Sequence, residues 1–198
     1  MSKNLDPGET IPDFELPDEN GGLHRLSELQ GDNVLVLHLS RGEHCPRERQ
    51  FHRELLPFHE WCAVAFTEVV SILPNELHDV YRLKISTGAN WTFLSDEALA
   101  VQRHFDINEY TDTHHDYATV PHTLILSPGR KIEKVYVGYW FWGRPTIHQL
   151  WADLGDIHMR IKADFDPTTP QARAAWEADR MAAAGGLRWG PDEHPTAE

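Results

Sequence analysis

One stretch, residues 34–73, decides the fold, and it reads VLVLHLSRGEHCPRERQFHRELLPFHEWCAVAFTEVVSIL. Residues 34–39 are a nearly continuous apolar run of strand length, which is typical of a strand covered on both faces. Residues 46–61 carry apolar side chains at helical spacing and begin with Pro46, which a first helical turn tolerates. A second buried strand is expected at 66–73. These short connections indicate a right-handed βαβ unit, so we expect an α/β protein with parallel strands in its sheet.

The rest of the chain extends this unit into one domain. Alternating apolar and polar residues around an Asn-Gly-Gly turn at 20–22 predict an N-terminal hairpin. Helices are expected near 75–85, near 97–104 and from Pro145, and strands at 91–94, 122–127 and 131–137. Residues 106–119 are polar and aperiodic, which predicts a surface loop. We expect a domain over 1–164 and a C-terminal tail over 165–198 that carries one short helix.

The composition limits the partners of the protein. With 18 Lys and Arg residues against 31 Asp and Glu residues, the formal net charge of −13 makes nucleic acid or an anionic membrane surface an unfavourable partner. The N-terminal residues hold no apolar stretch of signal-peptide length, and no run approaches the roughly 20 apolar residues of a membrane span. We therefore expect a cytoplasmic protein. Two cysteines are too few for a secreted disulfide scaffold, so what matters is whether either is reactive.

Cys45 is the candidate functional residue. It directly precedes Pro46 and is therefore expected at the N-cap of the helix, where free backbone N–H groups and the positive end of the helix dipole favour a thiolate. Charged residues surround it in the sequence: Arg41, His44, Arg47 and Arg49 are basic, and Glu43 and Glu48 are acidic. Because the thiolate is the nucleophilic form, we expect Cys45 to be reactive; the alternative is a small buried cysteine that only fills space.

Cys62 lies at the far end of the same helix, without cations near it in the sequence, and is interpreted as a core residue. A helix over 46–61 is about 24 Å long at 1.5 Å per residue, whereas the Cα atoms of bridged cysteines lie within about 7 Å. A disulfide between Cys45 and Cys62 would therefore require the helix to unwind.

Histidines and aromatic residues suggest two further sites. His114, His115 and His122 are close together in a chain of 13 histidines, but no paired Cys-x-x-Cys or His-x-x-x-His motif accompanies them. We therefore expect solvated loop histidines, no metal and no cofactor. An aromatic group at 136–142 is interpreted as packing or a dimer face, which leaves a homodimer open, with the lining of an organic substrate pocket as the alternative.

Several motifs together resemble a known superfamily. The order of elements, the Cys-Pro helix start and residues 119–126, TVPHTLIL, are similar to the thioredoxin superfamily. Residues 12–17, PDFELP, a Leu-Ser-Glu-Leu segment and residues 94–96, LSD, resemble peroxiredoxin-like proteins of the alkyl hydroperoxide reductase and thiol-specific antioxidant family. The resemblance covers about 9–157 and implies a thioredoxin-like fold: a mixed central sheet flanked by helices, with the N-terminal hairpin and the helical tail added.

The resemblance also implies a reaction and a set of site residues. A peroxiredoxin thiolate attacks one oxygen of a hydroperoxide and is left as a sulfenic acid. A loop with a cis proline faces the active cysteine in the thioredoxin superfamily. Val120 and Pro121 are the corresponding residues here, and with Gly42 and Pro46 they form the expected substrate-binding group. Cys45 is the expected nucleophile, and Arg41 and His44 complete the catalytic group because their charge is expected to favour its thiolate.

The chain departs from the family pattern at several positions. His38 and Gly42 stand where peroxiredoxins have Pro and Thr, seven and three residues before the cysteine. Glu48 stands where a related branch has a second cysteine. The arginine that peroxiredoxins supply from a later strand is also missing from its usual place, which leaves Arg41 as the best substitute and Arg144 as a weaker one.

These departures predict a one-cysteine cycle. With no second cysteine in reach, the sulfenic acid would be resolved by an external thiol, such as glutathione or a thioredoxin-like protein. Two alternatives stay open: a redox-inactive thioredoxin-fold binding or scaffold protein, and a thioredoxin-like metal-delivery protein.

Overall fold

The computed structural model describes residues 5–115, 117–139, 142–161, 169–171, 173–174 and 177–178. The chain divides into two compact units, Met1–Ile157 and His158–Glu198. The first unit holds the whole sheet and the candidate site. The expected boundary at 164 lies outside the described residues, and so does most of the tail, although helical residues are described at 170–171 and 173–174.

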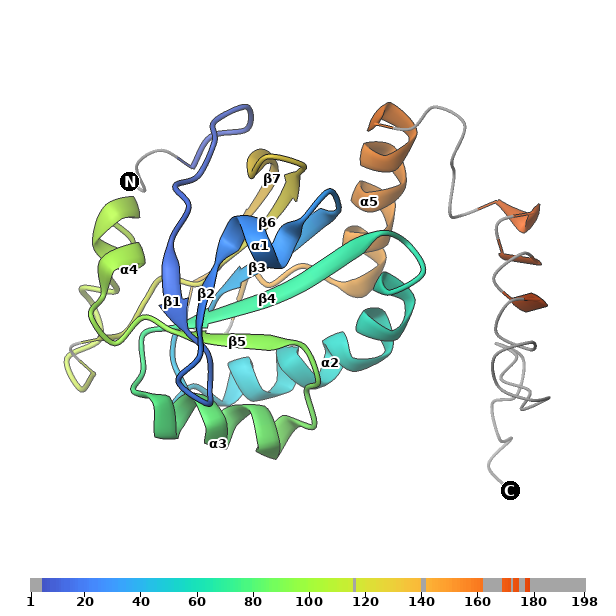
Figure 1. Ribbon diagram of the computed structural model, residues 1–198. Coiled ribbons are helices and arrows are strands. Elements are labelled where there is room, and N and C mark those ends of the chain that lie inside the picture. The colour runs from blue at the N-terminus through green and yellow to red at the C-terminus, as the bar shows by residue number, and fades with distance from the viewer. Residues whose placement is uncertain are drawn as a thin grey trace, which may run out of the picture. The chain divides into compact units, whose positions relative to one another are not determined.

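A five-stranded mixed sheet forms the centre of the first unit (Figure 1). Its strands are β3 Val34–Leu39, β4 Thr67–Leu73, β5 Thr92–Ser95, β6 His122–Ser127 and β7 Lys131–Val137. The order across the sheet is β5-β4-β3-β6-β7, with β3, β4 and β5 parallel, β6 antiparallel to β3, and β7 antiparallel to β6. Every residue of β3 is buried, as its apolar run predicted. The predicted βαβ unit and the two C-terminal strands are therefore confirmed.

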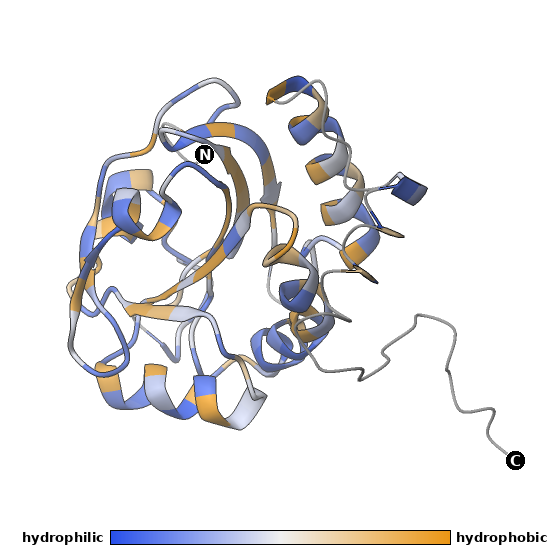
Figure 2. Ribbon diagram, turned by 45° about the vertical axis from the view of Figure 1, so that its right-hand side comes forward, coloured by the Kyte–Doolittle hydropathy of each residue, from blue (hydrophilic) through white to orange (hydrophobic). Residues whose placement is uncertain are grey.

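Helices cover both faces of this sheet. Their bounds are α1 Leu26–Gln30, α2 Pro46–Cys62, α3 Leu77–Thr87, α4 Ala100–Phe105 and α5 Ile147–Ile161. One apolar core joins the sheet to α2, α3 and α5 through residues such as Phe51 and Leu154, and a second joins the opposite face to α1 and α4 through Leu26 and Phe105. The strands are largely hydrophobic in Figure 2, whereas the helices carry both kinds of residue, as amphipathic covering layers do.

The N-terminal hairpin is present and leads into a helix that the sequence did not predict. Strands β1 Glu15–Pro17 and β2 Leu23–Arg25 pair antiparallel around the Asn-Gly-Gly turn. α1 follows β2 without a break, and its buried Leu26 belongs to the core. Asp13 accepts hydrogen bonds from the backbone N–H and the hydroxyl of Ser27 in the first turn of α1, at 2.8 and 2.7 Å. A side chain distant in sequence thus helps to hold a helix of five residues.

The prediction of a surface loop over 106–119 is wrong in part. Ile107, Ala118 and Thr119 are buried, and Asn108 pairs with Thr119 in an isolated β-bridge. The Gln102 side-chain amide of α4 donates to the Tyr117 and Ala118 carbonyls, each at 2.9 Å. Hydrogen bonds to groups elsewhere in the chain therefore satisfy a polar segment whose own sequence has no period.

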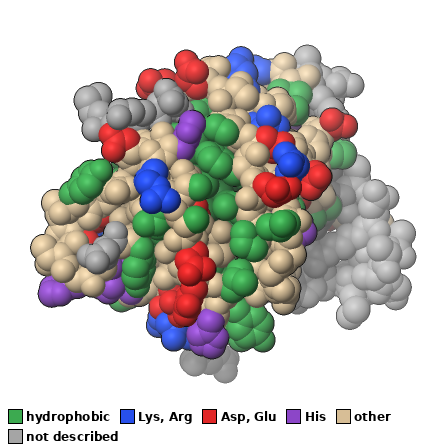
Figure 3. Space-filling view, turned by 60° about the vertical axis from the view of Figure 1, so that its left-hand side comes forward, with side chains coloured by type: hydrophobic (Ala, Val, Ile, Leu, Met, Phe, Trp, Pro, Cys, Tyr) green, Lys and Arg blue, Asp and Glu red, His purple; other side chains and the backbone are tan. Residues whose placement is uncertain are grey.

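The surface of the described chain carries mixed charge. Acidic, basic and apolar side chains are interspersed on the face drawn in Figure 3. Among the described residues, no helix is both long and apolar enough to cross a membrane. In the aromatic group, Tyr139 and Trp142 are exposed and bridge each other's backbone, whereas Trp140 and Phe141 lie outside the described residues.

Candidate active site at the start of helix α2

Cys45 occupies the N-cap of α2, as predicted. Its backbone is extended, with φ −82° and ψ 117°, and Pro46 begins the helix. The Cys45 carbonyl accepts a hydrogen bond from the Glu48 N–H at 3.1 Å, and the Cys45 N–H donates to the Gly42 carbonyl at 3.2 Å. Only 1% of Cys45 is exposed, so the thiol that the sequence predicts to be reactive does not meet solvent. A reagent can therefore reach the sulfur only if the surrounding chain opens.

Gly42 gives the loop between β3 and α2 its shape. Its φ of +135° is a conformation that residues with a side chain rarely adopt. A Cβ atom at this position would lie 2.9 Å from the His44 ring and 3.4 Å from Tyr117. The loop folds back on itself here, so a glycine fits where a side chain would clash. The threonine of the family pattern would not fit at this position, because its Cβ would meet the His44 ring.

Described residues of the 106–119 segment contact this loop. The Thr119 N–H donates to the Arg41 carbonyl at 3.2 Å, and Arg41 Nη2 donates to Asp112 Oδ2 at 2.7 Å. The rings of His44 and His115 are stacked, with centroids 3.7 Å apart. Sequence reasoning placed Arg41 and His44 at the site but missed Asp112, whose only signal was its place in a polar segment.

The basic residues around Cys45 are paired with carboxylates. Besides Arg41 with Asp112, the pairs are Arg47 with Glu54, Arg49 with Glu43, and Arg144 with Glu48. The local positive charge that the sequence suggested is therefore largely compensated. Favourable interaction with a thiolate then depends mainly on the dipole of α2, because Pro46 has no N–H and the Glu48 N–H donates to the Cys45 carbonyl.

His44 and Asp112 have strongly shifted ionisation. Burial, together with the neighbouring His115 and Arg41, lowers the pKa of His44 from 6.5 to about 4, so that this imidazole is neutral at pH 7. It does not supply the cation that the sequence suggested. Burial alone would raise the pKa of Asp112, but hydrogen bonds from His114 and His115 and the charge of Arg41 lower it to about 2. Asp112 is therefore a carboxylate at neutral pH.

Glu48, three residues after Cys45 in the first turn of α2, is the centre of a buried polar network. Its side chain is 0% exposed. Oε2 accepts from His38 Nε2 at 2.6 Å and from Ser40 Oγ at 3.1 Å, while Oε1 accepts from Arg144 Nε at 3.1 Å and from a terminal nitrogen of Arg144. Thr123 Oγ1 lies 3.0 Å from the other nitrogen of His38. The network links β3, β6 and the segment before α5 to the first turn of α2.

This network explains two of the departures from the family pattern. His38 takes part in it from the position where a proline was expected, and Arg144, considered only a weak substitute, is the arginine that enters it. Burial alone would raise the pKa of Glu48, but His38 and Arg144 hold it well below its usual range. A buried carboxylate that is fully paired in this way is ionised and fixes the position of its partners.

Val120 and Pro121 differ from the expectation that the superfamily implied. None of the described residues is joined by a cis peptide, so the bond between Val120 and Pro121 is trans. The Val120 N–H donates to the Ile107 carbonyl and the Pro121 carbonyl accepts from Gly138, each at 2.7 Å. His122, the first residue of β6, pairs with Leu39, the last residue of β3, so Pro121 lies beside the start of the loop that carries Cys45. Val120 and Pro121 therefore lie near the cysteine loop, as the resemblance implied, but the peptide bond between them is trans and not cis.

Cys62 is a core residue, as predicted. It is the last residue of α2, it is 0% exposed, and both cysteines are free thiols. Burial and then Glu68 raise its pKa far above the ordinary value. Cys62 is therefore an inert thiol at neutral pH.

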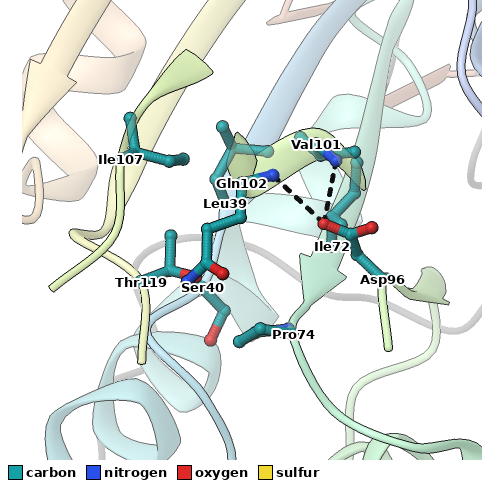
Figure 4. Close-up of a pocket in the computed structure, with 9 residues that line it drawn as sticks. All are labelled: Leu39, Ser40, Ile72, Pro74, Asp96, Val101, Gln102, Ile107 and Thr119. Carbon is teal, nitrogen blue, oxygen red and sulfur yellow. Dashed lines mark hydrogen bonds between the residues drawn. The ribbon is translucent and has the colours of Figure 1, made fainter. Parts of the chain in front are cut away.

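A small cavity lies behind the loop (Figure 4). Its lining includes Ser40 of the cysteine loop, Thr119 and Gln102. Asp96 points toward the start of α4 and accepts the N–H groups of Val101 and Gln102, at 3.0 and 3.2 Å (Figure 4). The cavity holds about 10 Å³, which is room for roughly one water, and Cys45 is not part of its wall. An organic substrate does not fit there.

A mixed sheet flanked by helices, with a cysteine at the N-cap of the helix after the central strand, defines a thioredoxin-like protein. Solved structures with the same fold support this class. The chain is similar to the peroxidoxin BcpB from Mycobacterium tuberculosis, at 20% identity and a TM-score of 0.66, over 80% of this chain and 98% of that one. It is also similar to reduced Prx3 from Vibrio vulnificus in complex with H2O2, at 14% identity and a TM-score of 0.68, over 76% and 99% of the chains.

The sequence identifies the family within this class. The profile of the AhpC/TSA family matches residues 7–135, so the chain belongs to that family. AhpC from Enterococcus faecalis has the same fold, with 12% identity and a TM-score of 0.69 over 82% of this chain and 98% of that one. Comparison with curated protein sequences found no match. Membership of the AhpC/TSA family supports a thiol-dependent redox function for the chain.

Proposed function

We propose that this protein is a one-cysteine thiol peroxidase that reduces hydroperoxides through Cys45. The observation that carries the proposal is the position of Cys45 at the N-cap of α2, directly after the central strand, in a member of the AhpC/TSA family. A developing thiolate there would be stabilised by the positive end of the α2 dipole. Cys62 is fully buried at the opposite end of α2 and is not available as a partner.

The proposed reaction begins with attack of the Cys45 thiolate on one peroxide oxygen. The S–O bond forms as the O–O bond breaks, and the departing oxygen takes a proton to leave as water or an alcohol. Cys45 is oxidised to a sulfenic acid and the peroxide is reduced. Gly42, Pro46, Val120 and Pro121 would line the approach to the sulfur, and Arg41 and His44 would hold the loop in place.

Recovery requires a thiol from outside the chain. That thiol attacks the sulfenic sulfur and releases water, which leaves a mixed disulfide. A second external thiol then attacks the mixed disulfide and returns Cys45 to its reduced form. Glutathione or a thioredoxin-like protein would supply these thiols.

The burial of Cys45 means that the site must open before it reacts. The contacts to be broken are those between 106–119 and the cysteine loop, chiefly the Arg41–Asp112 ion pair and the stacked His44 and His115 rings. We expect the reaction with hydrogen peroxide to be limited by this opening. The same burial favours the second candidate, a redox-inactive binding protein in which Cys45 only fills space.

Peroxide consumption separates the two candidates. The rate of hydrogen peroxide loss is measured with purified full-length protein and excess glutathione or a thioredoxin system. We expect catalytic turnover with wild type and with Cys62→Ser, and none above background with Cys45→Ser. Equal rates for wild type and Cys45→Ser would overturn the peroxidase and leave the binding protein.

A further inference from the structure

Three side chains with metal-binding atoms meet where the 106–119 segment crosses the cysteine loop. They are His44, Asp112 and His115, and one ligand atom from each lies within 4.8 Å of the others. We propose that they form a binding site for a divalent transition-metal ion, of which Zn²⁺ is the representative. Two imidazoles and one carboxylate suit Zn²⁺ and its first-row neighbours, and leave further coordination positions open to water.

The distances between the donor atoms fit such an ion. His44 Nε2 lies 3.8 Å and His115 Nδ1 lies 3.1 Å from Asp112 Oδ2. Donor atoms that bind one tetrahedral ion at about 2.1 Å are separated by about 3.4 Å. The two distances therefore lie within a few tenths of an ångström of the separation around one ion. The stacked rings at 3.7 Å must tilt apart as their nitrogens turn toward a shared ion.

The hydrogen bonds indicate the protonation state of the ring nitrogens that would bind the ion. Arg41 Nη1 lies 3.2 Å from His44 Nε2, and because a guanidinium only donates, that nitrogen presents a lone pair. The proton of a neutral His44 is then on Nδ1, which is buried and has no hydrogen-bond partner among the described residues. His115 Nδ1 faces both oxygens of Asp112 and carries a proton toward them. On binding, the ion replaces that proton, which moves through solvent to Nε2 of the same ring.

Asp112 is already oriented by its own loop. Its Oδ1 accepts the backbone N–H groups of His114 and His115, at 2.9 and 3.1 Å, while Oδ2 accepts from Arg41. An ion at Oδ2 would displace Arg41, and this competition predicts weaker binding than in a closed structural zinc site. The ligands come from segments far apart in sequence, which is why the absence of a spaced motif led to the expectation of no metal.

Calorimetric titration tests the site. The full-length protein is treated with a chelator, freed of it, and titrated with ZnCl2; we expect one equivalent to bind. His115→Ala is expected to weaken binding at least about tenfold, because it removes a ligand. The matched control is His114→Ala, since the neighbouring His114 contributes only its backbone N–H, and we expect wild-type affinity. Asp112→Asn keeps the oxygen that accepts these N–H groups and is expected to lose as much affinity as His115→Ala.

Two outcomes would overturn the site: no stoichiometric binding by wild type, or equal weakening by His114→Ala and His115→Ala. NMR of the wild-type protein tests the site even if a variant fails to fold. The ring-nitrogen NMR signals of His44 and His115 should shift with Zn²⁺ while that of the exposed His78 stays unchanged, and shifts confined to other histidines would also contradict the site. Because no cysteine is a ligand, Cys45→Ser should bind normally, which separates this inference from the peroxidase.

Discussion

Cys45 and Cys62 stand at opposite ends of the same helix, yet their surroundings assign them different chemistry. Cys45 is the N-cap of α2, at the positive end of the helix dipole. Cys62 lies among the apolar side chains of the core. Burial of the thiol raises the pKa of Cys62, so its proton is retained at neutral pH. The environment of each sulfur, and not its residue type, decides which one can react.

At this scale we predict that Cys62 resists alkylation in the folded protein. Iodoacetamide at pH 8 reacts with thiolates, and Cys62 is both protonated and fully buried. Peptide mass spectrometry should find Cys62 unmodified in native protein and fully modified after denaturation in urea. Rapid labelling of Cys62 without denaturant would show that α2 does not hold it in the core.

At the scale of the element, α2 is positioned by charge as well as by apolar packing. Glu48 in its first turn binds Arg144 and His38, which belong to other parts of the chain. Removal of one partner from a buried ion pair leaves the other charge without compensation in a medium that solvates it poorly. The start of α2, and with it Cys45, therefore depends on this carboxylate.

We predict that Glu48→Gln lowers the free energy of unfolding by about 3 kcal/mol or more, because Arg144 stays buried without its counter-charge. Urea unfolding measured by circular dichroism gives this value. Glu54→Gln is the control, since Glu54 pairs with Arg47 on the partly exposed side of the same helix and should cost less than about 1 kcal/mol. Similar losses for the two variants would contradict the role assigned to Glu48.

The sequence predicted the elements better than it predicted their contacts. The apolar run of β3 and the helical spacing of α2 are local patterns, so both elements and the position of Cys45 between them could be read directly. The fold of 106–119 depends on hydrogen bonds to Gln102 and Arg41, which local periodicity does not contain. The network of Glu48 was missed for the same reason, because its members meet only in the folded chain.

At the scale of the whole molecule, buried histidines link stability to pH. His52 of α2 donates from Nδ1 to the Glu48 carbonyl at 2.7 Å, and Ser71 Oγ donates to its Nε2 at 3.1 Å while accepting from Trp91 Nε1 at 3.0 Å. Burial, and then His38, lower the pKa of His52 from 6.5 to about 4. His52 is therefore neutral in the folded protein at pH 7.

The sign of the resulting pH dependence follows from this shift. The unfolded chain binds a proton at His52 below about pH 6.5 and the folded chain only below about pH 4, so stability is lost as the pH falls between these values. The loss is on the order of 3 kcal/mol, at about 1.4 kcal/mol per unit. Urea midpoints from pH 7 to pH 4.5 should fall less steeply for His52→Gln than for wild type. The exposed His78→Gln should follow wild type, and equal slopes for all three proteins would contradict the assignment.

The reaction of Cys45 with hydrogen peroxide is the most direct test of the proposed function. Full-length wild-type protein is mixed with one equivalent of hydrogen peroxide in the presence of a sulfenic-acid trap, and the adduct is located by peptide mass spectrometry. We predict an adduct on Cys45 in nearly every molecule, none on Cys62, and no adduct at all in Cys45→Ser. An unlabelled Cys45 in wild type, or the same labelling in Cys45→Ser, would show that this sulfur does not perform the chemistry.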